Sequence, residues 1–138
     1  MEWDTIPTPV GSPDFDQLLA VLRRQRPARP TLFEFFLNGP LYERVGGPLE
    51  PNWPEHLAAQ LRVVRAFHRL GYDYATFRVP GFAFPAAAVE QKATRSINDG
   101  AVIHDRQTLE QYEWLEPENA QYEVLEEAVS FVPEGMKL

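Results

Sequence analysis

The chain of 138 residues contains no cysteine, so it holds no disulfide, no thiolate nucleophile and no cysteine-ligated zinc. No apolar run approaches the ~20 residues that a membrane span requires. The opening residues Met1-Glu-Trp-Asp are acidic, and no apolar run follows them as it would in a signal peptide. These absences predict a cytoplasmic protein that has no membrane partner.

Positive charge is also scarce, because 13 basic residues face 20 acidic ones and leave a net charge of −7. Residues 105–138 hold nine acidic and two basic side chains, whereas residues 1–104 hold eleven of each. An acidic surface repels phosphates, so the sequence predicts no nucleic-acid partner. The acidic excess is itself typical of a solvated helix face.

Several motifs that carry chemistry are missing as well. The chain has no glycine-rich phosphate loop, no Gly-x-Ser-x-Gly elbow and no His-Glu-x-x-His motif. His56 and His68 are twelve residues apart on one predicted helix, which separates them by about 120° around its axis. They cannot converge on one ion, so we predict no metal site and no cofactor within this chain.

Helical and extended patterns alternate along the sequence. Helices are predicted where apolar residues recur at helical spacing or where caps are present: residues 12–27, 53–70, 105–112 and 117–131, with a short one near 86–92 in a loop over 82–98. Strands are predicted from short apolar runs: residues 31–37, 72–79 and 101–103, and a strand that begins near residue 133. This alternation predicts an α/β fold with a parallel sheet.

Several segments, taken in order, resemble a known family. They are Leu18-Leu-Ala-Val-Leu-Arg-Arg-Gln-Arg-Pro27, Arg29-Pro-Thr-Leu-Phe-Glu-Phe-Phe-Leu37, Leu70-Gly-Tyr-Asp73, Gly100-Ala-Val-Ile-His-Asp-Arg106, Tyr112-Glu-Trp114 with Pro117, and Pro133-Glu-Gly-Met-Lys137. As a set they resemble the opening of the uroporphyrinogen decarboxylase superfamily.

The resemblance implies that residues 1–138 form the N-terminal part of a (β/α)8 TIM barrel, after a loose arm over residues 1–11. Such barrels need about 250 residues, so the chain would supply roughly the first two-fifths. The family includes cofactor-free decarboxylases and zinc-dependent methyltransferases that act on corrinoid proteins or thiols. It therefore implies zinc or a corrinoid only if a longer protein exists.

Two departures from the family pattern favour the methyltransferase type. Decarboxylases carry two arginines in an Arg-Gln-Ala-Gly-Arg motif after the first strand, whereas this chain reads Phe35-Phe-Leu-Asn-Gly-Pro40. They also carry an aspartate about seven residues after the position of Asp73, where this chain has Pro80. A true porphyrinogen decarboxylase is therefore not expected.

Four residues are candidates for substrate binding at the strand ends, where barrel active sites lie. Glu34 sits within an apolar run, and an unpaired buried carboxylate costs several kcal/mol, so it should pair or do chemistry. Arg78 could bind an anion, although a salt bridge to Glu34 would explain both residues. Asn38 could face the pocket or form a turn, and His104 could exchange protons or lie exposed in a loop.

Two functions remain open from the sequence. In the first, the chain belongs to an enzyme that acts on a small anionic or methylated substrate in methyl transfer, with its catalytic residues unknown. In the second, it is a non-catalytic, truncated barrel piece that works only by assembling with another chain. An open strand edge favours association, so a homo-oligomer or a partner chain that completes the barrel is expected.

Overall fold

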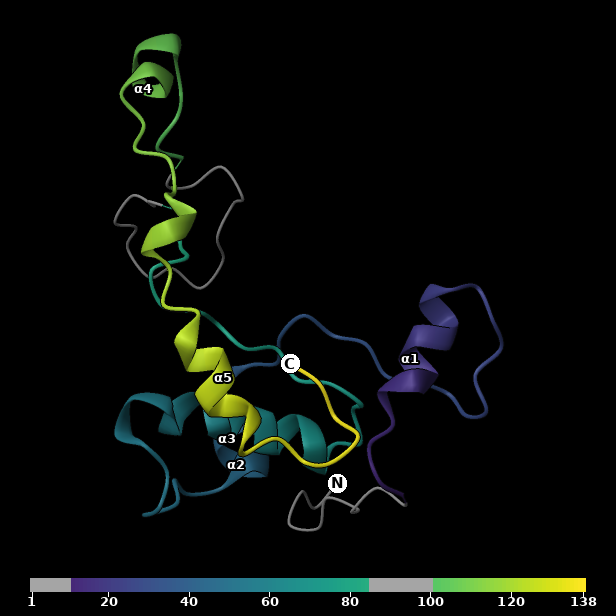
Figure 1. The fold of residues 1–138 in the computed structure, drawn as a ribbon. Helices are drawn as coiled ribbons and strands as arrows, with labels where there is room; N and C mark the ends of the chain where they lie inside the picture. The colour runs from purple at the N-terminus through teal and green to yellow at the C-terminus, as the bar shows by residue number, and fades with distance from the viewer. Residues whose placement is uncertain (1–10, 85–100) are drawn as a thin grey trace. The chain divides into compact units, whose positions relative to one another are not determined.

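The computed structural model describes residues 11–84 and 101–138 (Figure 1). The chain divides into two compact units, one formed by Met1–Arg78 with Tyr122–Leu138 and the other by Val79–Gln121. The predicted N-terminal arm lies outside the described residues except for Gly11, and the helix predicted near 86–92 lies outside them entirely.

The described residues form short helices joined by irregular segments. In chain order these are α1 (Phe15–Leu22), α2 (Gly39–Gly46), α3 (Glu55–Arg69), α4 (Arg106–Glu110), the 3-10 helix η1 (Pro117–Asn119) and α5 (Glu123–Val129).

The predicted fold class, an α/β TIM-barrel portion with parallel strands, is wrong for the described part of the chain, which contains no β-strand. The segments 31–37, 72–79 and 101–103 form no strand. One isolated parallel bridge joins Tyr74 to Lys137. A strand needs a continuous neighbour to accept and donate its backbone hydrogen bonds, and none of the three segments has one within the described residues.

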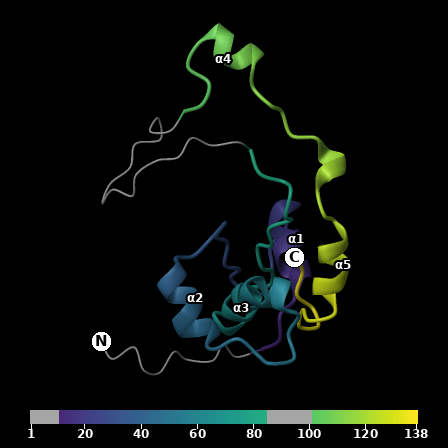
Figure 2. The same ribbon diagram turned by 90° about the vertical axis from the view of Figure 1, so that its left-hand side faces the viewer.

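The longest helix, α3, confirms the prediction for residues 53–70. The negative charge of Glu55 stabilises the positive N-terminal end of the helix. The helix stops before Gly71, which has a φ of 86°. Its apolar side chains occupy more than one side of the helix and are buried: Leu57, Ala58, Leu61, Val64, Ala66 and Phe67. Helix α3 is therefore the centre of the first unit, and Figure 2 shows it between α2 and α5.

Helix α2 was not predicted, because Asn38-Gly-Pro40 was interpreted as a turn. The Asn38 side chain accepts a hydrogen bond from the Leu41 N–H at 2.9 Å, and Pro40 occupies the first turn, so the same residues begin a helix. At its other end, a Cβ on Gly46 would lie 2.7 Å from the carbonyl oxygen of Arg62. Glycine there lets α2 approach α3 closely.

The other helices differ from the prediction mainly at their ends. The helix predicted over residues 12–27 covers only Phe15–Leu22, and Asp14 caps it by accepting from the Asp16 N–H at 3.1 Å. The helix predicted over residues 105–112 is present as the shorter α4, which Asp105 caps with its side chain 2.7 Å from the Thr108 N–H. The helix predicted over 117–131 is broken into η1 and α5, because Ala120 adopts an extended conformation.

The first unit is held together by two apolar clusters on α3. The first cluster surrounds Phe67 and includes Leu18 from α1, Tyr74 from the segment after α3, and Met136 near the C-terminus. The second joins Leu57 and Leu61 to Val124 and Ala128 of α5. Helix α3 thereby packs against segments from both ends of the chain.

The second unit buries little of its described surface. Ala120 alone is buried among its described residues. The Tyr112 and Trp114 rings meet edge to face at 5.0 Å, and the Gln121 N–H donates to the Pro80 carbonyl at 3.0 Å. None of the helices described in either unit is long and apolar enough to cross a membrane.

Candidate functional site

Among the described residues of the first unit, the most exposed apolar surface lies on residues 31–37, which we call the aromatic segment. Phe35 and Phe36 are each 71% exposed and Phe33 is 52% exposed, and Leu32 is also exposed. These side chains are adjacent in sequence, unlike the single exposed apolar residues that occur on most protein surfaces. The aromatic segment is therefore the first candidate for a functional surface.

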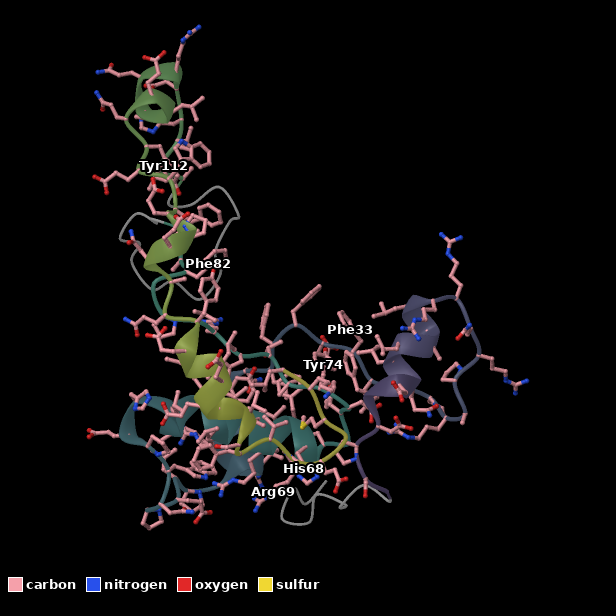
Figure 3. All side chains as sticks on the ribbon, viewed as in Figure 1. Phe33, His68, Arg69, Tyr74, Phe82 and Tyr112 are labelled. Atoms are coloured by element: carbon pink, nitrogen blue, oxygen red, sulfur yellow. The ribbon has the colours of Figure 1, made fainter. Side chains whose placement is uncertain are left out.

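Two tyrosine hydroxyls hold this segment to the unit. The Tyr74 hydroxyl accepts from the Glu34 N–H at 2.7 Å and donates to the Glu34 carbonyl at 2.5 Å. The Tyr42 hydroxyl accepts from the Leu37 N–H at 2.6 Å. The Phe33 ring stacks on Tyr74 with the centroids 5.5 Å apart, and Figure 3 shows the two rings side by side.

The remaining backbone of the segment is open. Leu32, Phe33, Phe35 and Phe36 make no backbone hydrogen bond within the described residues. The backbone bends at Phe35, and the unpaired N–H and C=O groups on either side of the bend can pair with the backbone of an incoming chain. This part of the surface offers hydrogen bonds and apolar contact together.

The tyrosines beneath the segment are shielded from water. Burial raises the pKa of Tyr72 above its ordinary value of 10.0, and the negative charge of Glu34 raises it further. Burial also raises the pKa of Tyr74, although the hydrogen bond from the Glu34 backbone works in the opposite direction. The Tyr74 hydroxyl, which holds the segment, therefore keeps its proton to a higher pH than a tyrosine in water does.

A second candidate is a small cavity of about 90 Å³ in the same unit. Its lining includes Ser12, Arg29, His68 and Asp73. Asp73 is 1% exposed and forms an ion pair with Arg29 through Oδ1, which also accepts from the Asp14 N–H at 2.8 Å. Asp73 Oδ2 is buried without a hydrogen-bond partner in the described part of the chain.

The contacts of Asp73 are structural in character. Its carboxylate joins the N-terminal end of α1 and the Arg29 side chain to the segment that follows α3. A buried carboxylate requires such pairing because desolvating a lone charge is costly. The cavity wall is thus built around an ion pair that the fold already needs.

The structure does not bring Glu34 and Arg78 together, although the sequence suggested a salt bridge. Both side chains are exposed, and no ion pair joins them within residues 11–84 and 101–138. The Arg78 backbone instead exchanges hydrogen bonds with the Gln60 side chain. Glu34 is exposed because nothing described covers the aromatic segment, contrary to the expectation that it is buried.

Among the described residues, the side chains of Asn38 and His104 make polar contacts only with residues close to them in sequence. The Asn38 side chain caps α2, so it is committed to the helix. His104 belongs to the second unit and is exposed, with Nε2 3.7 Å from an Asp105 oxygen. The Thr108 N–H holds the pKa of the Asp105 carboxyl below its ordinary value.

Sequence reasoning gave no functional or structural role to Tyr42, Tyr74, Arg29 or Asp73. The available signal was Asp73 itself, a lone acidic residue in the apolar sequence Tyr72-Asp-Tyr-Ala75. No comparable signal identifies Tyr42, whose hydroxyl bonds a residue five positions away. Within the described residues no group of three or more histidine or acidic side chains is arranged to hold a metal ion.

Comparisons of the chain with protein-family models, with curated proteins and with solved structures found no match. The geometry of the described residues therefore carries the functional argument.

Proposed function

We propose that this chain is a docking module that binds an extended segment of a partner protein along the aromatic segment, residues 31–37. The observation that carries the proposal is the combination of exposed Phe33, Phe35 and Phe36 with an unpaired backbone. In this form of binding the main-chain hydrogen bonds to an incoming segment supply affinity, and side-chain contacts supply selectivity.

The tyrosine contacts support this mode of binding. The Tyr74 hydroxyl binds the backbone of Glu34, and the Tyr42 hydroxyl binds the backbone of Leu37. The segment is thus partly ordered before a partner arrives, which lowers the entropy lost on docking. Phe35 and Phe36 retain most of their surface for contact with the incoming chain.

The enzyme hypothesis, methyl transfer on a small anionic or methylated substrate with zinc or a corrinoid, stays a prediction. Asn38 is used as a helix cap, and His104 is exposed. No contact of these residues favours that chemistry over docking. The cytoplasmic location likewise stays a prediction.

The proposal is tested by selecting binders from a display library of random peptides about twelve residues long, which are long enough to span residues 31–37. The immobilised target is the full chain, and an enriched peptide is resynthesised with a fluorescent label. We expect the Phe35→Ser/Phe36→Ser double variant to bind this peptide at least about tenfold more weakly, because it lacks two aromatic rings that become buried when the peptide binds.

The matched control is Phe82→Ser/Phe84→Ser, which removes two exposed aromatic rings of the second unit. This control should bind the labelled peptide as the unchanged protein does. Equal weakening in both double variants, or a library that yields no enriched peptide, would contradict the proposal. Urea denaturation of each variant verifies that a loss of binding is not a loss of folding.

A further inference from the structure

We infer that the segment bound by the aromatic segment carries a lysine or arginine that faces Glu34. This inference rests on the proposed docking function and adds the chemistry of the partner. Glu34 is the one charged residue among residues 31–37, and it stands between Phe33 and Phe35.

The argument begins with what docking does to Glu34. Its side chain is now exposed and makes no ion pair within the described residues. A chain that pairs with the backbone of residues 31–37 comes close to the Glu34 carboxylate and removes part of the water that solvates it. A buried carboxylate needs a charged or hydrogen-bonding partner, and a basic side chain supplies the strongest one.

The position of Glu34 along the segment makes this pairing selective. Its backbone N–H and C=O are held by Tyr74, so residue 34 is the fixed point of the segment. A basic residue of the partner at one register position meets the carboxylate, whereas a shift by one residue turns that side chain to the opposite face. Glu34 thereby selects both the partner and its register.

A second copy of this chain is a poorer occupant. Antiparallel pairing of two aromatic segments about their centres would place Glu34 opposite Glu34, and like charges directly opposite are destabilising. The net charge of −7 on each copy adds repulsion between them. A partner with a basic residue gains from both features.

The experiment repeats the peptide selection on the Glu34→Lys variant, with Glu134→Lys as the control. Glu134 is an exposed residue of the same unit, so the control matches the change in net charge. We expect peptides selected on the unchanged protein and on Glu134→Lys to share a lysine or arginine at one position. Peptides selected on Glu34→Lys should carry aspartate or glutamate there.

A quantitative measurement follows with one resynthesised peptide and its variant in which the basic residue is replaced by glutamate. The exchange should weaken binding to the unchanged protein at least about tenfold and strengthen binding to Glu34→Lys. A coupling of this sign shows that the two side chains meet in the complex.

The outcomes separate this inference from the proposed function. Enriched apolar peptides without a fixed basic position, or the same sequences on Glu34→Lys, would overturn the inference and leave the docking function standing. A failure to enrich any peptide would overturn both. Light scattering that finds a dimer, abolished by Phe35→Ser/Phe36→Ser, would identify a second copy as the occupant and overturn the inference.

Discussion

Two groups of aromatic side chains in the first unit meet at Tyr74 but have opposite surroundings. On one side Tyr74 contacts Phe67, a residue of α3 that is 0% exposed and belongs to the first apolar cluster. On the other side it stacks on Phe33, which continues into the exposed Phe35 and Phe36. Phenylalanine thus contributes to the core where helices cover it. It remains available for contact with a partner where no described residue covers it.

The two groups also differ in their backbone hydrogen bonds, which are satisfied in the buried group and open in the exposed one. Phe67 lies inside α3, whose hydrogen bonds are satisfied within the helix. Phe35 and Phe36 have no backbone hydrogen bond within the described residues. Exposed rings and unpaired backbone occur together, which is why the aromatic segment suits a partner better than it suits the interior.

The largest expected effect is a loss of folding stability when the buried Phe67 is truncated. Phe67→Ala should lower the free energy of unfolding by about 3–5 kcal/mol, because it leaves a cavity where Leu18, Tyr72 and Tyr74 now pack. Phe36→Ala should change it by less than about 0.5 kcal/mol. Urea denaturation followed by circular dichroism measures both, and similar losses in the two variants would show that Phe36 is buried in solution.

The second effect concerns the ion pair that anchors α1. Arg29→Ala should cost about 2–3 kcal/mol of unfolding free energy, because it leaves the carboxylate of Asp73 buried without its cation. This loss is smaller than the ~3–5 kcal/mol for breaking a fully buried pair, since the Arg29 side chain is 40% exposed.

Arg29→Lys is the control for this prediction, because it keeps the charge and loses the planar guanidinium. It should lose less stability than Arg29→Ala in the same urea titration. Equal stability of the alanine variant and the unchanged protein would mean that water reaches Asp73 and that the pair contributes nothing.

Much of the local structure was predictable because its signals are local. Pro54 and Glu55 at one end and Gly71 at the other define α3, and Asp105 defines the start of α4. Asn38-Gly-Pro40 was ambiguous, since the same residues form a turn or begin a helix, and only packing of Gly46 on α3 decides between them.

The strands and the site were not predictable, because both depend on distant residues. The run Thr31-Leu-Phe-Glu-Phe-Phe-Leu37 has strand-forming composition, but a ladder requires a neighbour that the run itself does not specify. Glu34 was expected to be buried on the same reasoning, and its exposure follows from the missing cover. The bond from Tyr74 to Glu34 joins residues forty positions apart, for which no local pattern exists.

A smaller effect is expected at the residue that both aromatic groups share. Tyr74→Phe removes the two hydrogen bonds to the Glu34 backbone while it keeps the ring, so it should cost about 1–2 kcal/mol. The Glu34 amide should then exchange its hydrogen faster. Tyr72→Phe is the matched control, since the Tyr72 hydroxyl makes no hydrogen bond within the described residues. If Tyr74→Phe leaves Glu34 exchange unchanged, the segment is held by Phe33 stacking alone.

The smallest effect is a loss of stability at high pH. The pKa values of Tyr72 and Tyr74 are raised in the folded protein, mainly by burial, and the Glu34 charge adds to the rise for Tyr72, so the unfolded chain ionises first as the pH rises. Stability should therefore be complete below pH ~10 and fall above it, as the unfolded state loses protons that the folded state keeps. The urea midpoint measured from pH 8 upward checks this, and a Tyr72→Phe/Tyr74→Phe double variant should show a shallower decline. An identical decline in that variant would assign the alkaline sensitivity to residues outside the tyrosine pair.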